Sequence, residues 1–153
     1  MIFGVSPTKD AVVIARTTGR RETFAIKSIA SIPFEMRSGD DLTELLRRLV
    51  AMFDRDGKRT LSAIALLGSS SGRFKASVEA IKAEAIIELA AAHTSVPVVK
   101  VTAASLIRAL ACTVGQKWHS RAGELLNPKG RHQNWSRGAA GAAAAAYKVA
   151  GGR

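Results

Sequence analysis

The sequence predicts an α/β domain with a mixed five-stranded sheet and helices on its faces. Two observations lead to this prediction. First, three apolar or alternating segments come early and are joined by short turns, which is typical of an antiparallel meander. Second, two more apolar strands follow, each next to segments with helical spacing, and such βα units place their strands in parallel with right-handed crossovers. The expected order is β-β-β-α-β-α-β-α-α, without counting a short helix inside the basic irregular segment near the C-terminus.

The strands are recognised by β-branched composition, by alternation with a period of two, or by continuous apolar character. The turn Pro7-Thr8-Lys9-Asp10 separates the first two strands. Continuous apolar strands are typical of a sheet buried on both faces, so 1–6, 60–67 and 96–101 are expected to form its parallel core. The five expected strands are 1–6, 11–18, 22–33, 61–67 and 96–101.

The helices are recognised by apolar residues three or four positions apart and by capping residues. Asp40 and Asp41 lie in the first turn of a helix that ends at Gly57. The long helix 73–93 follows from the spacing of Phe74, Val78, Ile81, Ala85, Ile86 and Leu89. The remaining helices are expected at 103–113, after the cap Thr102, at 118–126, within a basic irregular segment at about 115–136, and at 137–150, where alanines dominate.

Length and composition fit one folded domain that spans residues 1–153. The chain is 47% hydrophobic and 23% charged, which excludes general disorder. No apolar run reaches the roughly 18 to 20 residues that a membrane helix needs, and the start lacks the features of a signal peptide. Cys112 is alone and cannot form an internal disulfide, so a cytoplasmic location is expected.

The charge is concentrated in the C-terminal part. Residues 89–153 contain nine Lys or Arg and one acid, Glu124, a net charge of +8, whereas residues 1–88 have 14 Lys or Arg and 11 acids, a net charge of +3. A basic region of this kind indicates an anionic partner, first of all DNA or RNA. The alternatives are a solubilising excess of charge and a patch that a partner protein covers.

Two stretches sharpen the comparison with a known family. Ile2-Phe3-Gly4-Val5-Ser6-Pro7 resembles the first strand of RuvC-type Holliday-junction resolvases, which reads apolar-apolar-Gly-apolar-Asp-Pro-Gly. The segment 72–87 resembles the long central helix of small bacterial relatives of that group, and Arg137–Ala150 resembles the last helix of the resolvases. With the order of elements, the resemblance covers nearly the whole chain and implies a ribonuclease H-like fold.

Enzymes of that fold cleave phosphodiesters with two divalent ions held by three or four carboxylates. The matching positions here carry no acid: Ser6 stands in the first strand, Gly68 or Ser69 at the end of the fourth, and Gly138 and Gly141 in the last helix. The resemblance therefore implies a domain whose catalytic carboxylates are absent, with no metal and no cofactor. A divergent nuclease with a displaced site at Asp10 and Glu84 is the enzymatic alternative.

The candidate nucleic-acid contacts are basic residues of the C-terminal part and one arginine from the loop 68–73, whose backbone could hold a phosphate. Trp135 is either a ring that stacks on bases or part of the core. The candidate contacts are Arg73, Lys117, Arg121, Lys129, Arg131, Trp135 and Arg137.

A homodimer is expected as well, because the long central helix contributes to the dimer in resolvases. Ala76, Ala80 and Ala83 are the candidate contacts on that helix, and the small-residue face 138–146 either packs on its own sheet or forms an interface. Three hypotheses stand: a nucleic-acid-binding or scaffolding domain without catalysis, the displaced-site nuclease, and a protein-interaction domain whose charge is incidental.

Overall fold

The computed structural model describes residues 1–57, 61–68 and 77–152. The strands are β1 (Ile2–Pro7), β2 (Ala11–Thr18), β3 (Ala25–Pro33), β4 (Ala63–Leu67) and β5 (Val98–Val101). The helices are α1 (Gly39–Gly57), α2 (Val78–His93), α3 (Ala103–Ala109), α4 (Trp118–Leu126) and α5 (Ala140–Ala150). No helix in this part of the chain is long and apolar enough to cross a bilayer.

The five strands form one mixed sheet in the order β3-β2-β1-β4-β5. β1 pairs with β2 and β2 with β3 in antiparallel register, whereas β1 with β4 and β4 with β5 are parallel. The expected meander and the expected parallel core are both confirmed. Since β1 lies in the middle, its carboxyl end at Ser6 and Pro7 comes beside the end of β4.

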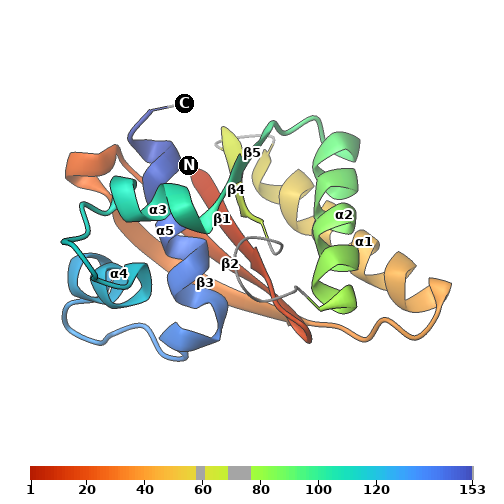
Figure 1. Cartoon of the computed structure of the whole chain (residues 1–153). Coiled ribbons are helices and arrows are strands. Elements are labelled where there is room, and N and C mark those ends of the chain that lie inside the picture. Colours follow the sequence, from red (N-terminus) through yellow and green to blue (C-terminus); the bar gives the residue numbers. More distant parts are fainter. Residues whose placement is uncertain (58–60, 69–76, 153) are drawn as a thin grey trace.

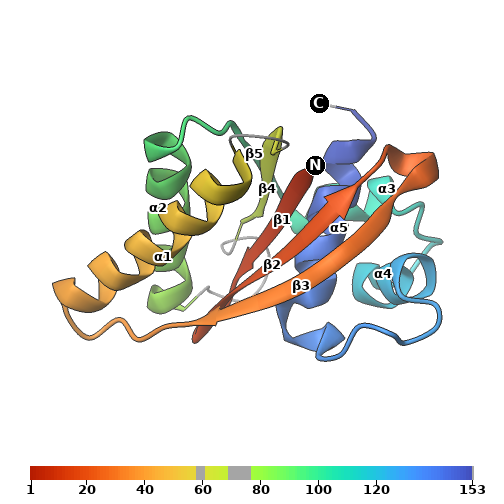
Figure 2. The ribbon, with the colours of Figure 1, turned by 180° about the vertical axis from the view of Figure 1, so that it is seen from behind.

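The helices cover the sheet as two layers (Figures 1 and 2). α1 and α2 lie together on one side, while α3, α4 and α5 lie on the other. Side chains alternate between the two faces of the sheet, so both faces carry a hydrophobic core. Phe3 and Val5 of β1 belong to the cluster under α1 and α2, whereas Ala65 and Leu67 of β4 belong to the cluster around α5.

Helix α5 is buried all around its first two turns, since every residue from Ala140 to Ala146 is buried. A Cβ atom on Gly4 of β1 would lie 1.7 Å from the Ala142 carbonyl oxygen, so the helix backbone rests directly on the strand. The small-residue face of this helix therefore packs on its own sheet, which was one of the two sequence-based alternatives.

Several predicted boundaries move. The third strand begins at Ala25 rather than at 22, because Arg21–Thr23 form a 3-10 turn. The helix predicted from 103 to 113 ends at Ala109. The last helix begins at Ala140 rather than at 137, since Arg137 and Gly138 have non-helical dihedral angles. Residues 69–76, where the long helix was predicted to begin, lie outside the described part of the chain.

The face of α2 was predicted wrongly. The residues that contact the core are small ones and one isoleucine, namely Ala80, Ala83, Ile87, Ala90 and Ala91. The larger side chains that suggested an amphipathic helix point to solvent, with Val78, Ile81 and Leu89 exposed by 63%, 50% and 46%. Ala80 and Ala83 are therefore core residues. The expectation that they face a second copy is wrong.

Candidate nucleic-acid interface

Ser6 and Gly141, two of the positions where the resemblance expects acids, meet where β1, β4 and α5 come together. The Ser6 side chain points from β1 towards α5 and is buried, at 7% exposure. A Cβ atom on Gly141 would lie 3.2 Å from Ser6 Oγ and 2.7 Å from Leu67 Cδ2. A carboxylate side chain at this position would therefore require the Leu67 side chain to move.

Gly138 is closed to side chains for two reasons. Its φ of +96° lies in the region that favours glycine, and a Cβ atom there would lie 2.8 Å from Val13 Cγ2 and 3.1 Å from Thr8 Cγ2. Gly138 thus lets the chain press onto β2 and the β1–β2 turn before α5 begins. Both glycines, which stand where the resemblance expects metal ligands, serve close packing.

The acids of the displaced-site hypothesis sit on different elements. Asp10 is exposed on the β1–β2 turn, where its Oδ1 lies 3.2 Å from the Thr8 hydroxyl oxygen. Glu84 of α2 reaches the end of β4, with Oε1 3.9 Å from the place of a Cβ on Gly68. Ser69, the other candidate there, lies outside the described residues.

The donor set does not fit a pair of magnesium ions. Residues 1–57, 61–68 and 77–152 contain no group of three or more His, Cys, Asp or Glu that could hold a metal. Two hard dications need several carboxylate oxygens that converge, and Ser6, Gly138 and Gly141 provide none.

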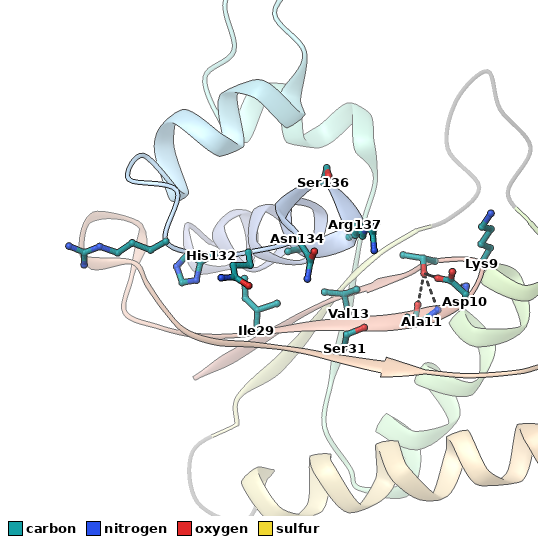
Figure 3. Close-up of a pocket in the computed structure, with 15 residues that line it drawn as sticks. Lys9, Asp10, Ala11, Val13, Ile29, Ser31, His132, Asn134, Ser136 and Arg137 are labelled. Carbon is teal, nitrogen blue, oxygen red and sulfur yellow. Dashed lines mark hydrogen bonds between the residues drawn. The ribbon is translucent and has the colours of Figure 1, made fainter.

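A wide hollow of about 950 Å³ opens beside Gly138, between the β1–β2 turn and the segment 131–139 (Figure 3). We call this feature the basic hollow, because Lys9, Arg131 and Arg137 line it and Asp10 is its one acid. Its other lining residues are Thr8, Ala11, Val13, Ile29, Ser31, His132, Gln133, Asn134, Ser136, Gly138 and Ala139.

The structure gathers only some of the predicted contacts in this hollow. Arg131 and Arg137 line it, and Lys129 is exposed in the loop just before it. Lys117 lines a separate hollow with Trp118 and His119. Arg73 lies outside the described part of the chain.

Arg121 is placed differently from the other predicted contacts. Its Nε donates a hydrogen bond of 2.9 Å to the Leu110 carbonyl oxygen, and its Nη1 lies 3.5 Å from Glu124 Oε2. These contacts tie the end of α3 to α4. We therefore leave Arg121 out of the proposed phosphate contacts.

Trp135 packs inside the C-terminal layer. Its ring is partly buried against the clusters around α5. A Cβ atom on Gly123 of α4 would lie 3.5 Å from the ring nitrogen Nε1. Nε1 is buried, and no residue of the described ranges 1–57, 61–68 and 77–152 makes a hydrogen bond with it. Of the two roles considered for this ring, this position favours packing in the core over stacking on bases.

Trp118 and His119 form a second pair of rings in the basic region. The His119 ring stacks on Trp118 at a centroid distance of 3.5 Å. Loss of hydration, followed by the charge of Lys117, lowers the pKa of His119 below the ordinary histidine value of 6.5. The ring is therefore neutral at pH 7 and adds nothing to the positive charge of this surface.

Lys9 is a residue of the hollow that the sequence analysis missed. A signal was available, because Lys9 follows Ser6 and Pro7 in the turn at the end of the first strand. Ile29 and Ser31 gave no such signal, since only the pairing of β3 with β2 brings them beside Val13.

Comparisons with known proteins agree with the fold. The structure is similar to RuvC of Thermus thermophilus in complex with a Holliday junction substrate, with a TM-score of 0.73 and 14% identity over 96% of this chain and 90% of that one. A second Thermus thermophilus RuvC structure gives a TM-score of 0.72 at the same identity and coverage. No family model and no curated protein matches the sequence. The likeness shows a ribonuclease H-like fold of the RuvC type.

Proposed function

We propose that this chain is a ribonuclease H-like domain that does not catalyse cleavage and binds nucleic acid through its basic C-terminal part. One observation carries the proposal: Gly138 and Gly141, the positions where the resemblance expects metal ligands, pack closely against β1, β2 and β4. The same region exposes Lys129, Arg131 and Arg137. The RuvC structure solved with a Holliday junction substrate supports nucleic acid as the class of partner.

The charge distribution supports binding to a phosphate backbone. Residues 89–153 have a net charge of +8, and the acid Glu124 in that part is itself engaged by Arg121 and Gln116. Cations that neutralise phosphates release counterions from the nucleic acid, which drives association at low salt.

We also propose that the domain is a homodimer joined through the outer face of α2. Val78, Ile81, Ala85 and Leu89 are exposed along that face at spacings of three and four residues. An apolar stripe with this spacing is what helix–helix packing buries. A second copy is the partner favoured by the resemblance to resolvases, whose long central helix contributes to the dimer.

The experiment that tests the absence of catalysis measures cleavage and binding in parallel. Labelled DNA and RNA, including a four-way junction, are incubated with the protein in Mg²⁺, in Mn²⁺ and in EDTA. We expect no cleavage in any condition and no gain of affinity when metal is added, because Ser6, Gly138 and Gly141 offer no carboxylate.

Two other outcomes would support the competing hypotheses. Cleavage in Mn²⁺ that is lost in Asp10→Asn or Glu84→Gln would establish the displaced-site nuclease. No binding to any nucleic acid at about 50 mM salt, where phosphate contacts are strong, would leave the protein-interaction domain.

A further inference from the structure

The basic hollow has an apolar floor and cationic rims. Val13 of β2 and Ile29 of β3 lie beneath the segment that contains Arg137 (Figure 3). Lys9 and Asp10 stand at one end in this view, His132 at the other, and Arg137 between them. The hollow therefore offers cations for a negatively charged ligand and, at Ile29, some apolar surface.

The acid in the hollow is held by the turn to which it belongs. The Thr8 hydroxyl lies 2.8 Å from the Ala11 carbonyl oxygen, accepts the Ala11 amide at 3.0 Å and lies 3.2 Å from Asp10 Oδ1. Asp10 is thus held at the turn by a local hydrogen bond. The hollow keeps an excess of positive charge, because three cations line it against this one carboxylate.

The opposite rim, around His132, is held in place by hydrogen bonds and ring packing. Asn127 accepts a hydrogen bond from the His132 amide at 3.2 Å and donates one to the His132 carbonyl oxygen at 3.3 Å. The His132 ring lies nearly parallel to the Trp135 ring, at 6.2 Å and 29°. Gly138 then anchors the segment on Val13 and Thr8, so the hollow is preformed before a ligand arrives.

We infer that the basic hollow binds an unpaired stretch of a nucleic-acid strand, with a base against Ile29 and Ser31 of β3 and its phosphates beside Lys9, Arg131 and Arg137. The inference rests on the proposed function and narrows it to single-stranded substrate. In a duplex the bases are stacked and paired, so a duplex could meet only the rims. An unpaired base is free to enter and cover the apolar floor.

The test compares one strand with its own duplex in variants of the floor. Fluorescence anisotropy gives dissociation constants for an oligonucleotide of about 12 nucleotides, a length within the usual site sizes, as DNA and as RNA, and for the blunt duplexes. Ser31→Leu narrows the hollow beside Ile29 without a change of charge. Ser28→Leu is the matched control, because Ser28 is also exposed on β3 and does not line the hollow.

We expect the single strand to bind more tightly than the duplex. Ser31→Leu should weaken single-strand binding about tenfold, the scale of one lost base contact, and leave duplex binding and Ser28→Leu unchanged. Arg131→Gln with Arg137→Gln should weaken single-strand binding as well, which keeps the test valid if Ser31→Leu is unstable. The ratio of DNA to RNA affinity identifies the preferred sugar.

Two results would overturn the inference while leaving the proposed function intact. One is duplex affinity equal to or above that of the single strand. The other is a folded Ser31→Leu variant that binds the single strand as well as Ser28→Leu does. A protein that binds neither form would instead contradict the proposed function itself.

Discussion

Gly138 and Gly141 determine which side chains fit at the sheet edge near Ser6. A Cβ on Gly141 would meet Leu67 at 2.7 Å, and one on Gly138 would meet Val13 at 2.8 Å in a backbone conformation with φ of +96°. An aspartate at either position would have to displace these neighbours before it could bind a metal. At Gly138 the positive φ adds backbone strain for any other residue, whereas at Gly141 only the flexible end of the Leu67 side chain would have to move.

The predicted role of Trp135 can be tested at the same scale. The ring packs between α4 and the clusters around α5, so Trp135→Ala should lower the free energy of unfolding by about 3 to 5 kcal/mol. Trp135→Phe should cost less, because the buried Nε1 gives up no hydrogen bond. Urea denaturation measures both values.

The control for this prediction is single-strand affinity under conditions where the variants remain folded. If Trp135 stacked on bases, Trp135→Ala would lose about 1 to 3 kcal/mol of binding and keep its stability. That pattern would contradict the packing role and restore the ring to the nucleic-acid contacts.

At the scale of the element, sequence patterns located most helices and strands but not the orientation of α2. Composition and turn residues predicted β1, β2, β4 and α4 closely, because each signal is local. In α2, four alanines and Ile87 form one face, and the larger residues Val78, Ile81 and Leu89 lie on the other. Periodicity therefore marked two apolar faces without showing which one the sheet covers. The sheet accepts the small residues because they allow the helix to approach closely.

The dimer through α2 predicts a clear change in mass. Ile81→Glu with Leu89→Glu should convert a dimer into a folded monomer. The free energy needed to bury an unpaired charge in an apolar interface exceeds the free energy that the original apolar contacts contribute. Light scattering measures the mass, and circular dichroism measures the helix content. The structure gives both side chains room, since they are exposed in the isolated chain.

Ile107→Glu is the matched control, because Ile107 is an isoleucine of similar exposure, 48%, on α3. This variant should keep the mass of the parent protein. A parent protein that is monomeric at high concentration would contradict the dimer, and a dimer that survives both α2 substitutions would place the interface elsewhere.

At the scale of the whole molecule, the order of elements was sufficient for the topology, whereas the basic hollow was not visible in the sequence. Three antiparallel strands followed by βα units allow few arrangements, and the observed sheet is the expected one. The hollow combines Lys9, Ile29 and Arg137, which lie more than a hundred positions apart at the extremes and come together only through strand pairing and the docking of α5. The lining could not be derived without the fold.

The charge asymmetry of the molecule predicts how binding depends on salt. If residues 89–153 contact the phosphate backbone, the logarithm of the association constant should fall linearly with the logarithm of salt concentration. Lys129→Glu with Arg131→Glu should reduce that slope by about two, the number of contacts removed. Both residues are exposed in the loop after α4, so the fold should tolerate the change.

Lys27→Glu with Arg55→Glu provides the same change in net charge on β3 and α1, away from the C-terminal part. A general attraction between a basic protein and a polyanion would respond equally to both pairs, because it depends on net charge. A local interface would respond to the first pair alone, because counterion release counts the cations in contact with phosphates. Equal slopes for the two double variants would therefore contradict an interface in residues 89–153, even if the parent protein binds nucleic acid.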